Sequence, residues 1–177
     1  MSVILFETKR LTCRPLSAAD TDEMYGVYSD ADAMRWVDDG QPIARGACAQ
    51  WVEVTLRNYA SRGYGMSVLV SRQTQTVVGF CGLVHPDSQP EAEIKYALYR
   101  QFWGLGLATE AVVAMLDYGR HKLQLHEIIA TVAPENVASR RVLLKAGMQA
   151  VADRHNPDGS LTNVFKWPSS QLASDRP

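Results

Sequence analysis

The chain lacks the cysteine and histidine groupings that build disulfide frameworks and zinc sites. Its 177 residues include only three cysteines, Cys13, Cys48 and Cys81, which lie far apart and form no Cys-x-x-Cys pair. No histidine cluster accompanies them. We therefore expect neither a disulfide framework nor a bound metal, and a reducing cytoplasm is the simplest compartment.

Long apolar runs and long basic runs are missing as well. The apolar start at residues 3–6 is too short for a signal peptide, and no run approaches the length of a membrane span. With 18 basic and 19 acidic residues the formal net charge is −1, and no basic stretch offers a footprint for nucleic acid. These absences favour a cytoplasmic protein that contacts neither a membrane nor nucleic acid directly.

Apolar periodicity and turn residues predict a mixed α/β fold. A chain of this length fits one domain, which we place at residues 1–168, followed by a polar C-terminal tail at 169–177. Strands are predicted at residues 3–16, 66–71, 76–84, 93–99 and 128–133, with two more around the turn at 156–159. Helices are predicted at residues 17–28, 44–57, 106–122 and 136–146. Successive hairpins indicate an antiparallel half, and the strand–helix–strand from 93 to 133 indicates a parallel connection.

Two of these helices carry apolar stripes. In the helix at 106–122 the stripe is formed by Leu107, Ala111, Met115 and Tyr118 at intervals of three and four residues. In the helix at 44–57 the corresponding stripe is predicted at Ala47, Trp51 and Val54, with Tyr59 as a possible extension. These stripes are the expected core faces.

The most informative segment is the turn between the strand at 93–99 and the long helix that follows. The first N–H groups of a helix lack internal partners, and the helix dipole adds positive potential there. Gly104 and Gly106 have no Cβ, so a phosphate can approach their backbone and each can adopt positive φ. The segment therefore predicts an anion site.

Spacing decides between three kinds of phosphate turn. A P-loop needs Gly-x-x-x-x-Gly-Lys-Ser/Thr, which is absent. A dinucleotide fingerprint fails because Thr109 stands where its third glycine or alanine belongs, and because no acidic residue ends the next strand. The third pattern, Gln/Arg-x-x-Gly-x-Gly/Ala, is matched by Gln101-Phe-Trp-Gly104-Leu-Gly106.

On these residues the chain resembles the GNAT superfamily of N-acetyltransferases, and within it the RimJ/RimL-like ribosomal-protein acetyltransferases. The resemblance extends over nearly the whole chain and is carried by residues 7–16, 77–83, 103–111 and 136–147. It implies the GNAT acyl-CoA N-acyltransferase fold, in which a mixed, mostly antiparallel sheet with flanking helices is splayed in its middle. Here the splay would lie between the strands at 93–99 and 128–133.

The resemblance also implies the cosubstrate and its contacts. Acetyl-CoA would lie in the gap of the sheet, with its pyrophosphate on the N–H groups of residues 101–106 and its pantetheine along the strand before them. Backbone amides of that strand would polarise the thioester carbonyl. The implied contacts are Tyr96, Ala97, Leu98, Tyr99, Gln101, Phe102, Trp103, Gly104, Leu105, Gly106, Leu107, Ala108, Thr109, Asn136 and Ser139.

Several of these residues have a plainer structural interpretation. Gly104 and Gly106 also suit a tight strand-to-helix turn for geometry alone. Asn136 would bond the pantetheine arm or cap the helix that begins there. Ser139 would protonate the departing thiolate, as the RimL-like pattern suggests, or serve only local bonding in a first helical turn. Thr109 would donate to phosphate or cap its helix.

Glu93 is the leading general-base candidate. N-acetylation needs a neutral amine, whereas a free lysine amine keeps its proton up to a pKa of about 10.4. A carboxylate can accept that proton, often through water. Glu93 begins the strand that would bind the thioester, and the alternative is a solvated carboxylate on an edge strand. Glu91 is a weaker substitute, and Glu110 is assigned to the helix dipole.

The acceptor stays open at this point. RimL-like sequences often carry an acidic residue soon after the late hairpin glycine, but Gly159 is followed by Ser-Leu-Thr-Asn. The nearby loop residues Asp153, His155 and Asp158, and the aromatic residues Trp36, Trp51 and Tyr64, are candidates for the acceptor side.

We therefore expect transfer of an acetyl group to a primary amine, on a protein N-terminus (ribosomal or other) or on a small molecule, by direct attack. A non-catalytic acyl-CoA sensor and a plain partner-binding domain are the alternatives. Folds of this kind are frequently dimeric, so a homodimer is compatible with the pattern.

Overall fold

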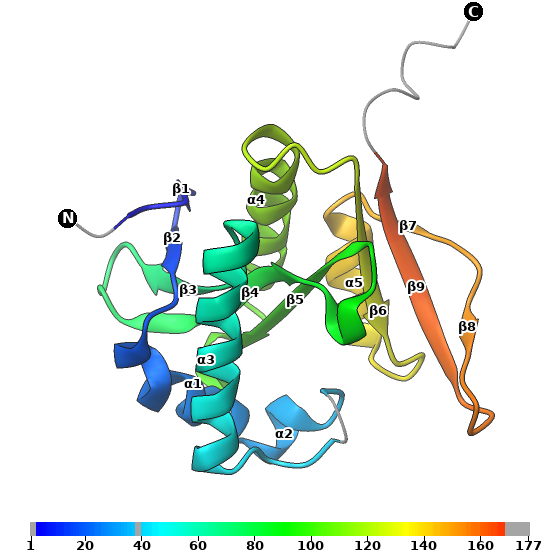
Figure 1. Ribbon diagram of the computed structural model, residues 1–177, viewed down its shortest axis with the longest axis horizontal. Helices are drawn as coiled ribbons and strands as arrows, with labels where there is room; N and C mark the ends of the chain where they lie inside the picture. Colours follow the sequence, from blue (N-terminus) through cyan, green and yellow to red (C-terminus); the bar gives the residue numbers. More distant parts are fainter. Residues whose placement is uncertain (1–2, 38–39, 169–177) are drawn as a thin grey trace, which may run out of the picture.

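The computed structural model describes residues 3–37 and 40–168 (Figure 1). The strands are β1 (Phe6–Glu7), β2 (Leu11–Pro15), β3 (Met66–Ser71), β4 (Val77–Val84), β5 (Ala92–Leu98), β6 (Glu127–Val132), β7 (Gln149–Ala150), β8 (Arg154–His155) and β9 (Leu161–Pro168). The helices are α1 (Thr21–Tyr28), α2 (Ala31–Met34), α3 (Arg45–Arg62), α4 (Leu107–His121) and α5 (Val137–Lys145). The tail expected at 169–177 lies outside the described residues.

The strands form a mixed, mostly antiparallel sheet, as predicted. Their order is β1-β2-β3-β4-β5-β6-β9-β7, and β8 pairs with β9. Every neighbouring pair is antiparallel except β5 and β6, which the crossover helix α4 joins in parallel. The predicted hairpin at residues 66–84 is present, and the late turn at 156–159 connects β8 to β9.

The sheet opens between its two parallel strands. Pairing between β5 and β6 is limited to Ala92 opposite Ile128 and Glu93 opposite Ile129. Beyond these pairs β5 stays on β4, whereas β6 stays on β9. We call the space between β5 and β6 beyond Glu93 the gap. The splay that the resemblance implied is therefore present at the predicted place.

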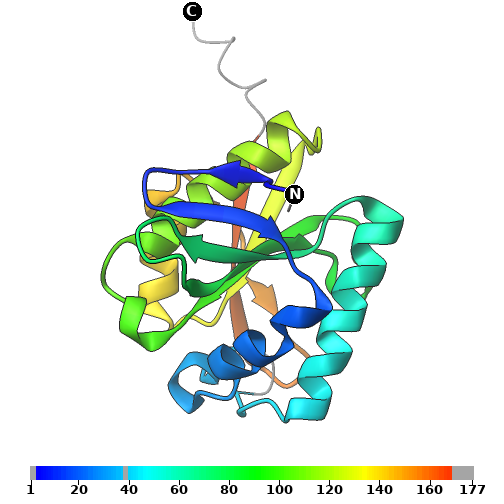
Figure 2. The same ribbon diagram turned by 90° about the vertical axis from the view of Figure 1, so that its left-hand side faces the viewer.

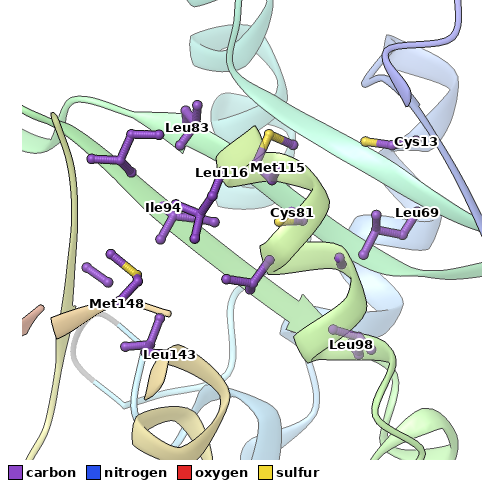
Figure 3. Packing of buried hydrophobic residues seen from close by; sticks show 14 of the residues in the cluster. Cys13, Leu69, Cys81, Leu83, Ile94, Leu98, Met115, Leu116, Leu143 and Met148 are labelled. Atoms are coloured by element: carbon purple, nitrogen blue, oxygen red, sulfur yellow. The ribbon is translucent and has the colours of Figure 1, made fainter. Parts of the chain in front are cut away.

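Side chains on the two faces of the sheet enter two separate cores. Leu69, Cys81 and Ile94 belong to a cluster with α4 and α5, and Figure 3 shows Met115 and Leu116 of α4 pointing toward Cys81 and Ile94. The strand side chains at the alternating positions point to the other face and pack with α1 and α3. The buried residues of these two helices include Met24, Val27, Cys48 and Val52. Because successive strand side chains point to opposite faces, the helices sandwich the sheet. Figure 2 shows α3 on one side of the strands and α4 on the other.

Two element predictions were wrong in detail. The predicted strand at 3–16 is split into β1 and β2, because Thr8 and Arg10 form a turn whose Thr8 N–H donates to Leu11 O at 2.8 Å. In α3 the buried stripe is Cys48, Val52 and Thr55, so the predicted stripe is displaced by one residue.

Two further helices give opposite outcomes. In α4 the predicted stripe is right, since Leu107, Ala111 and Met115 are buried. The short α2 was not predicted.

None of the helices in residues 3–37 and 40–168 is long and apolar enough to cross a membrane.

Candidate active site

The glycine turn (residues 101–106) has the backbone of an anion site. Gly104 and Gly106 adopt φ of 74° and 77°, and Gly106 is the N-cap of α4. Nothing lies within 4 Å of the position that a Cβ on Gly104 would take. In the described part of the chain, the N–H groups of residues 104–106 make no recorded hydrogen bond. Together with the first N–H groups of α4 they are free to donate to a phosphate.

Side-chain contacts fix the glycine turn from the side of β1 and β2. Arg10 donates from Nη1 to Leu105 O at 2.8 Å and pairs through Nε with Glu110 Oε2 at 2.6 Å. Thr8 Oγ1 also donates to Glu110, at 2.6 Å. Burial raises the pKa of Glu110, but the hydrogen bonds from Thr8 and Arg10 outweigh it and leave the pKa below its usual value. Glu110 therefore anchors the first turn of α4, beyond the dipole role predicted for it.

Other residues in and just before the glycine turn make contacts that hold the backbone in place. Arg100 pairs with Asp30 at 2.6 Å and with Asp32 at 2.8 Å, which ties the segment before the turn to α2. Trp103 donates its indole N–H to Leu98 O at 2.9 Å. Gln101 is exposed, and Thr109 is not the helix cap because Gly106 takes that position.

The strand β5 presents an unpaired edge to the gap. Tyr99 N–H donates to Val78 O at 3.0 Å, on the β4 side. Backbone groups alternate in direction along a strand, so the N–H groups of Leu98 and Tyr96 point to the opposite side, toward the gap. The carbonyl of Leu98 is consistent with this, because it accepts from Trp103 rather than from β4. Tyr96 and Leu98 thus offer free backbone donors next to the glycine turn.

Tyr96 and Ser139 meet on the α5 side of the gap. Their hydroxyl oxygens lie 2.5 Å apart, and the Tyr96 hydroxyl lies 3.3 Å from Ser139 O. Burial raises the pKa of Tyr96 to about 12, partly offset by the hydrogen bond with Ser139. Asn136 caps α5, since its Oδ1 accepts from Ser139 N at 3.1 Å. The capping interpretation of Asn136 is correct, and its amide nitrogen has no recorded partner among the described residues.

Glu93 is buried and fully partnered. Its side chain is 2% exposed, so it is not the solvated edge carboxylate that the sequence left as an alternative. One carboxylate oxygen accepts from Thr131 and pairs with Lys95, and the other accepts from Gln89 Nε2 at 3.1 Å. Thr131 belongs to β6, so this contact closes the base of the gap. Lys95 completes the group from the same face of β5.

His85 is a site residue that sequence reasoning missed. Its Nδ1 lies 2.9 Å from Gln89 O, and its Nε2 lies 2.7 Å from the Tyr64 hydroxyl. Because a carbonyl only accepts, Nδ1 carries the proton in the neutral ring and Nε2 accepts from Tyr64. The signal in the sequence was only a histidine directly after a buried strand.

A cavity of about 1250 Å³ is lined by several of these groups, but not by the glycine turn or Glu93. It reaches from α1 and α3 across the gap to the β8–β9 hairpin, and Lys95, Tyr96, Thr131, Asn136 and Ser139 all line it. Trp36 and Trp51 line its α1–α3 end, although Trp51 was expected in the core and also packs against the buried cluster there. Tyr64 does not line it and contacts His85 instead. The loop residues Asp153, His155 and Asp158 are not part of the lining, whereas Asn156 and Thr162 are.

In the described ranges no group of three or more His, Cys, Asp or Glu side chains is placed to hold a metal ion. Cys13, Cys48 and Cys81 are buried and free.

A splayed sheet, a glycine turn with free backbone N–H groups and a cavity behind the open strand edge are the features expected of an acyl-CoA transferase fold. The chain matches the family described as "Acetyltransferase (GNAT) domain" over residues 10–149. A protein of Bacillus licheniformis named "Uncharacterized N-acetyltransferase p20" is 33% identical over 168 residues, which are 90% of this chain and 92% of that one. The chain therefore belongs to the GNAT acetyltransferases, enzymes that use acetyl-CoA.

Solved structures agree on the fold. An acetyltransferase from Agrobacterium tumefaciens is 26% identical, with a TM-score of 0.79 over 93% of this chain and 94% of that one. RimL, the ribosomal L7/L12 alpha-N-protein acetyltransferase in complex with coenzyme A, is 15% identical, with a TM-score of 0.80 over 94% and 98% of the two chains. At the level of fold, the likeness to RimL fits the RimJ/RimL-like resemblance.

Proposed function

We propose that the protein transfers the acetyl group of acetyl-CoA to a primary amine by direct attack in a ternary complex. The observation that carries this proposal is the unpaired edge of β5, which lies between the free N–H groups of the glycine turn and the cavity. A thioester placed along this edge has donors for its carbonyl and an open side from which an amine can approach.

The glycine turn is the proposed pyrophosphate site. Its free N–H groups and the α4 dipole supply the attraction, and Arg10 and Glu110 hold the turn in place. The amide nitrogen of Asn136 and the N–H groups of Tyr96 and Leu98 are the proposed pantetheine contacts. The residues present therefore fit the cosubstrate that the family uses.

Proton transfer is assigned to the two sides of the gap. Tyr96 and Ser139 form a hydroxyl pair that can protonate the departing thiolate, and Tyr96 carries its proton at neutral pH. Glu93 is the proposed acceptor of the amine proton, through Thr131 or a water in the cavity. Its burial and partners fix its position, which favours proton relay over direct contact with a bulky acceptor.

The acceptor is proposed to be a monoamine, either a protein N-terminus or a small molecule. The names of the structural neighbours RimL and the Vibrio fischeri ribosomal-protein-S5-alanine acetyltransferase support a protein N-terminus. A cytoplasmic location and a homodimer remain part of the proposal, as does a single domain over residues 1–168.

The test is a thiol-release assay with acetyl-CoA across small amines and short peptides, alongside calorimetric titration of coenzyme A. We expect coenzyme A to bind and thiol to be released only with an acceptor present. Binding without release for any amine would instead favour the non-catalytic sensor. No binding at all would overturn the assignment of the glycine turn.

A further inference from the structure

One amine of the protein itself lies in the acceptor part of the cavity. Lys95 is on β5, two residues beyond the last pair with β6, and its side chain is 42% exposed and lines the cavity. Its Nζ pairs with Glu93 and donates across the gap to Thr131 Oγ1 at 3.3 Å. These contacts hold the amine at the base of the gap.

The direction of Lys95 is set by the strand. Tyr96 points to the α4–α5 face, where it meets Ser139, and Ala97 packs in the cluster with α1 and α3. Lys95 shares the face of Ala97 because side chains alternate along a strand. On the proposed function, the thioester lies along the β5 edge, so Ser139 is on the leaving-group side and Lys95 is on the side of amine attack.

We propose that Lys95 is an internal acetyl acceptor, which the enzyme modifies when no external amine fills the cavity. This proposal rests on the proposed function. Glu93 first takes a proton from the Lys95 ammonium. The neutral Nζ then forms a bond to the thioester carbonyl carbon, the carbon–sulfur bond breaks, and the thiolate takes a proton from the hydroxyl pair, which regains one from the acylated nitrogen. From ammonium and thioester the sum is an acetylamide, free thiol and one proton, which Glu93 holds.

Acetylation would change the state of Glu93. An acetylated lysine carries no charge, so the ion pair between Lys95 and Glu93 is lost while Thr131 and Gln89 still contact the carboxylate. The modification would thus remove the cation that competes with an acceptor amine for Glu93.

The chain provides a matched control for this reaction. Lys166 is 43% exposed and pairs with Glu127 Oε1 at 3.1 Å, so it resembles Lys95 in exposure and pairing. It lies on β9 and does not line the cavity. Chemical acetylation by acetyl-CoA in solution would label both lysines at similar rates.

The experiment incubates the whole protein with acetyl-CoA and no acceptor, and follows acetylation by mass spectrometry of tryptic peptides. Because trypsin does not cleave after acetyl-lysine, the product is a peptide of residues 73–100 with one added acetyl group. We expect Lys95 to be acetylated at least about tenfold faster than Lys166, because only Lys95 would lie next to the bound thioester. Lys95→Arg should abolish that peptide, while Lys166→Arg should leave it unchanged.

Two outcomes would overturn the proposal while the proposed function stands. One is equal labelling of Lys95 and Lys166. The other is no labelling of Lys95 in protein that binds coenzyme A and releases thiol with an external amine. Failure of both binding and thiol release would instead overturn the proposed function, and this inference with it.

Discussion

Tyr96 is the proposed proton donor to the leaving thiol. Its hydroxyl lies 2.5 Å from the Ser139 hydroxyl, and burial raises its pKa to about 12. We expect Tyr96→Phe to lower kcat about 100-fold, as is typical for loss of a general acid, with the Kd for coenzyme A changed little. A raised pKa keeps the proton on Tyr96 as pH rises, so Tyr96 should cause no fall in activity until the pH approaches about 12.

Tyr99 provides the control for this substitution. It stands on the same segment, but its hydroxyl contacts Glu23 at 2.7 Å instead of Ser139. Tyr99→Phe should keep kcat near the wild-type value in a steady-state assay. A wild-type kcat in Tyr96→Phe would remove Tyr96 as the donor and leave Ser139 or solvent.

For Glu93, the difficulty is to separate a proton acceptor from a buried counter-ion. Glu93→Gln should lower kcat at neutral pH about 100-fold with nearly normal coenzyme affinity. It also leaves Lys95 without its ion-pair partner, so stability falls as well. The double variant Glu93→Gln/Lys95→Met removes that unpaired charge.

Thermal unfolding and kcat should respond differently in these two variants. We expect the double variant to regain part of the lost stability without regaining kcat. Recovery of kcat together with stability would show that Glu93 serves only as a partner for Lys95.

Sequence reasoning selected Glu93 as the general-base candidate but did not describe its surroundings. Its place at the start of β5 was readable, and period-two alternation puts Lys95 on the same face. Thr131 and Gln89 could not be predicted as its partners, because one comes from a different strand and the other from a loop. His85 was missed for the same reason, since its contacts with Tyr64 and Gln89 arise only in three dimensions.

Among the elements, the glycine turn carries the binding prediction. Gly104 and Gly106 hold positive φ, which costs a β-branched residue about 1–2 kcal/mol per position. A Gly104→Val/Gly106→Val variant should raise the Kd for coenzyme A at least about tenfold. The strained backbone and the added side chains would both keep the phosphate from the N–H groups of the turn.

Gly63 separates this binding loss from general strain. It has φ of 81° at the end of α3, an added Cβ there would meet nothing within 4 Å, and the residue is not part of the glycine turn. Gly63→Val should lose stability in denaturant unfolding yet keep the wild-type Kd in calorimetry. Unchanged affinity in the folded turn variant would refute the phosphate site.

The contact of Glu110 with Thr8 and Arg10 makes stability depend on pH. A carboxylate whose pKa is lowered on folding stabilises the protein above its unfolded pKa, about 4.3, and loses this contribution as pH falls through the folded value. Glu110→Gln should therefore be less stable than the wild type by about 1–2 kcal/mol at pH 7. The difference should shrink below about pH 4, as measured by urea unfolding across pH. A difference in unfolding free energy that stays constant across this pH range would contradict an ionic role for Glu110.

The element predictions failed where local signals were weak. The β1–β2 turn contains no glycine, proline or asparagine, so nothing marked it within residues 3–16. In α3, the small residues Cys48 and Thr55 are buried, while the larger Val54 is 43% exposed, so hydrophobicity alone placed the stripe incorrectly. The glycine turn and α4 were predictable because residue type and periodicity agreed there.

Over the whole molecule, the cavity limits which amines can be acceptors. Among the described residues its lining holds two carboxylates, Asp87 and Glu135, and two cations, Arg62 and Lys95. Because Lys95 is paired with the buried Glu93, the site has a surplus of one negative charge. A polyamine or an aminoglycoside would need a larger surplus to offset its own desolvation. The α1–α3 end instead offers aromatic surface, including Trp36 and Trp51.

We therefore expect an amine with one positive charge and an aromatic or branched apolar group to be preferred. In competition assays, phenethylamine or a peptide with an apolar first residue should exceed spermidine in kcat/KM by about tenfold or more.

Trp36→Ala should reduce the ratio of kcat/KM between phenethylamine and ethylamine about tenfold without changing the Kd for coenzyme A. Trp36 suits this test because its side chain is 43% exposed, so its removal leaves the core intact. Val113→Ala, a change of similar exposure on α4 away from the cavity, should leave the ratio unchanged. A higher kcat/KM for spermidine than for phenethylamine would mean that charges beyond the cavity lining, and not its aromatic end, select the acceptor.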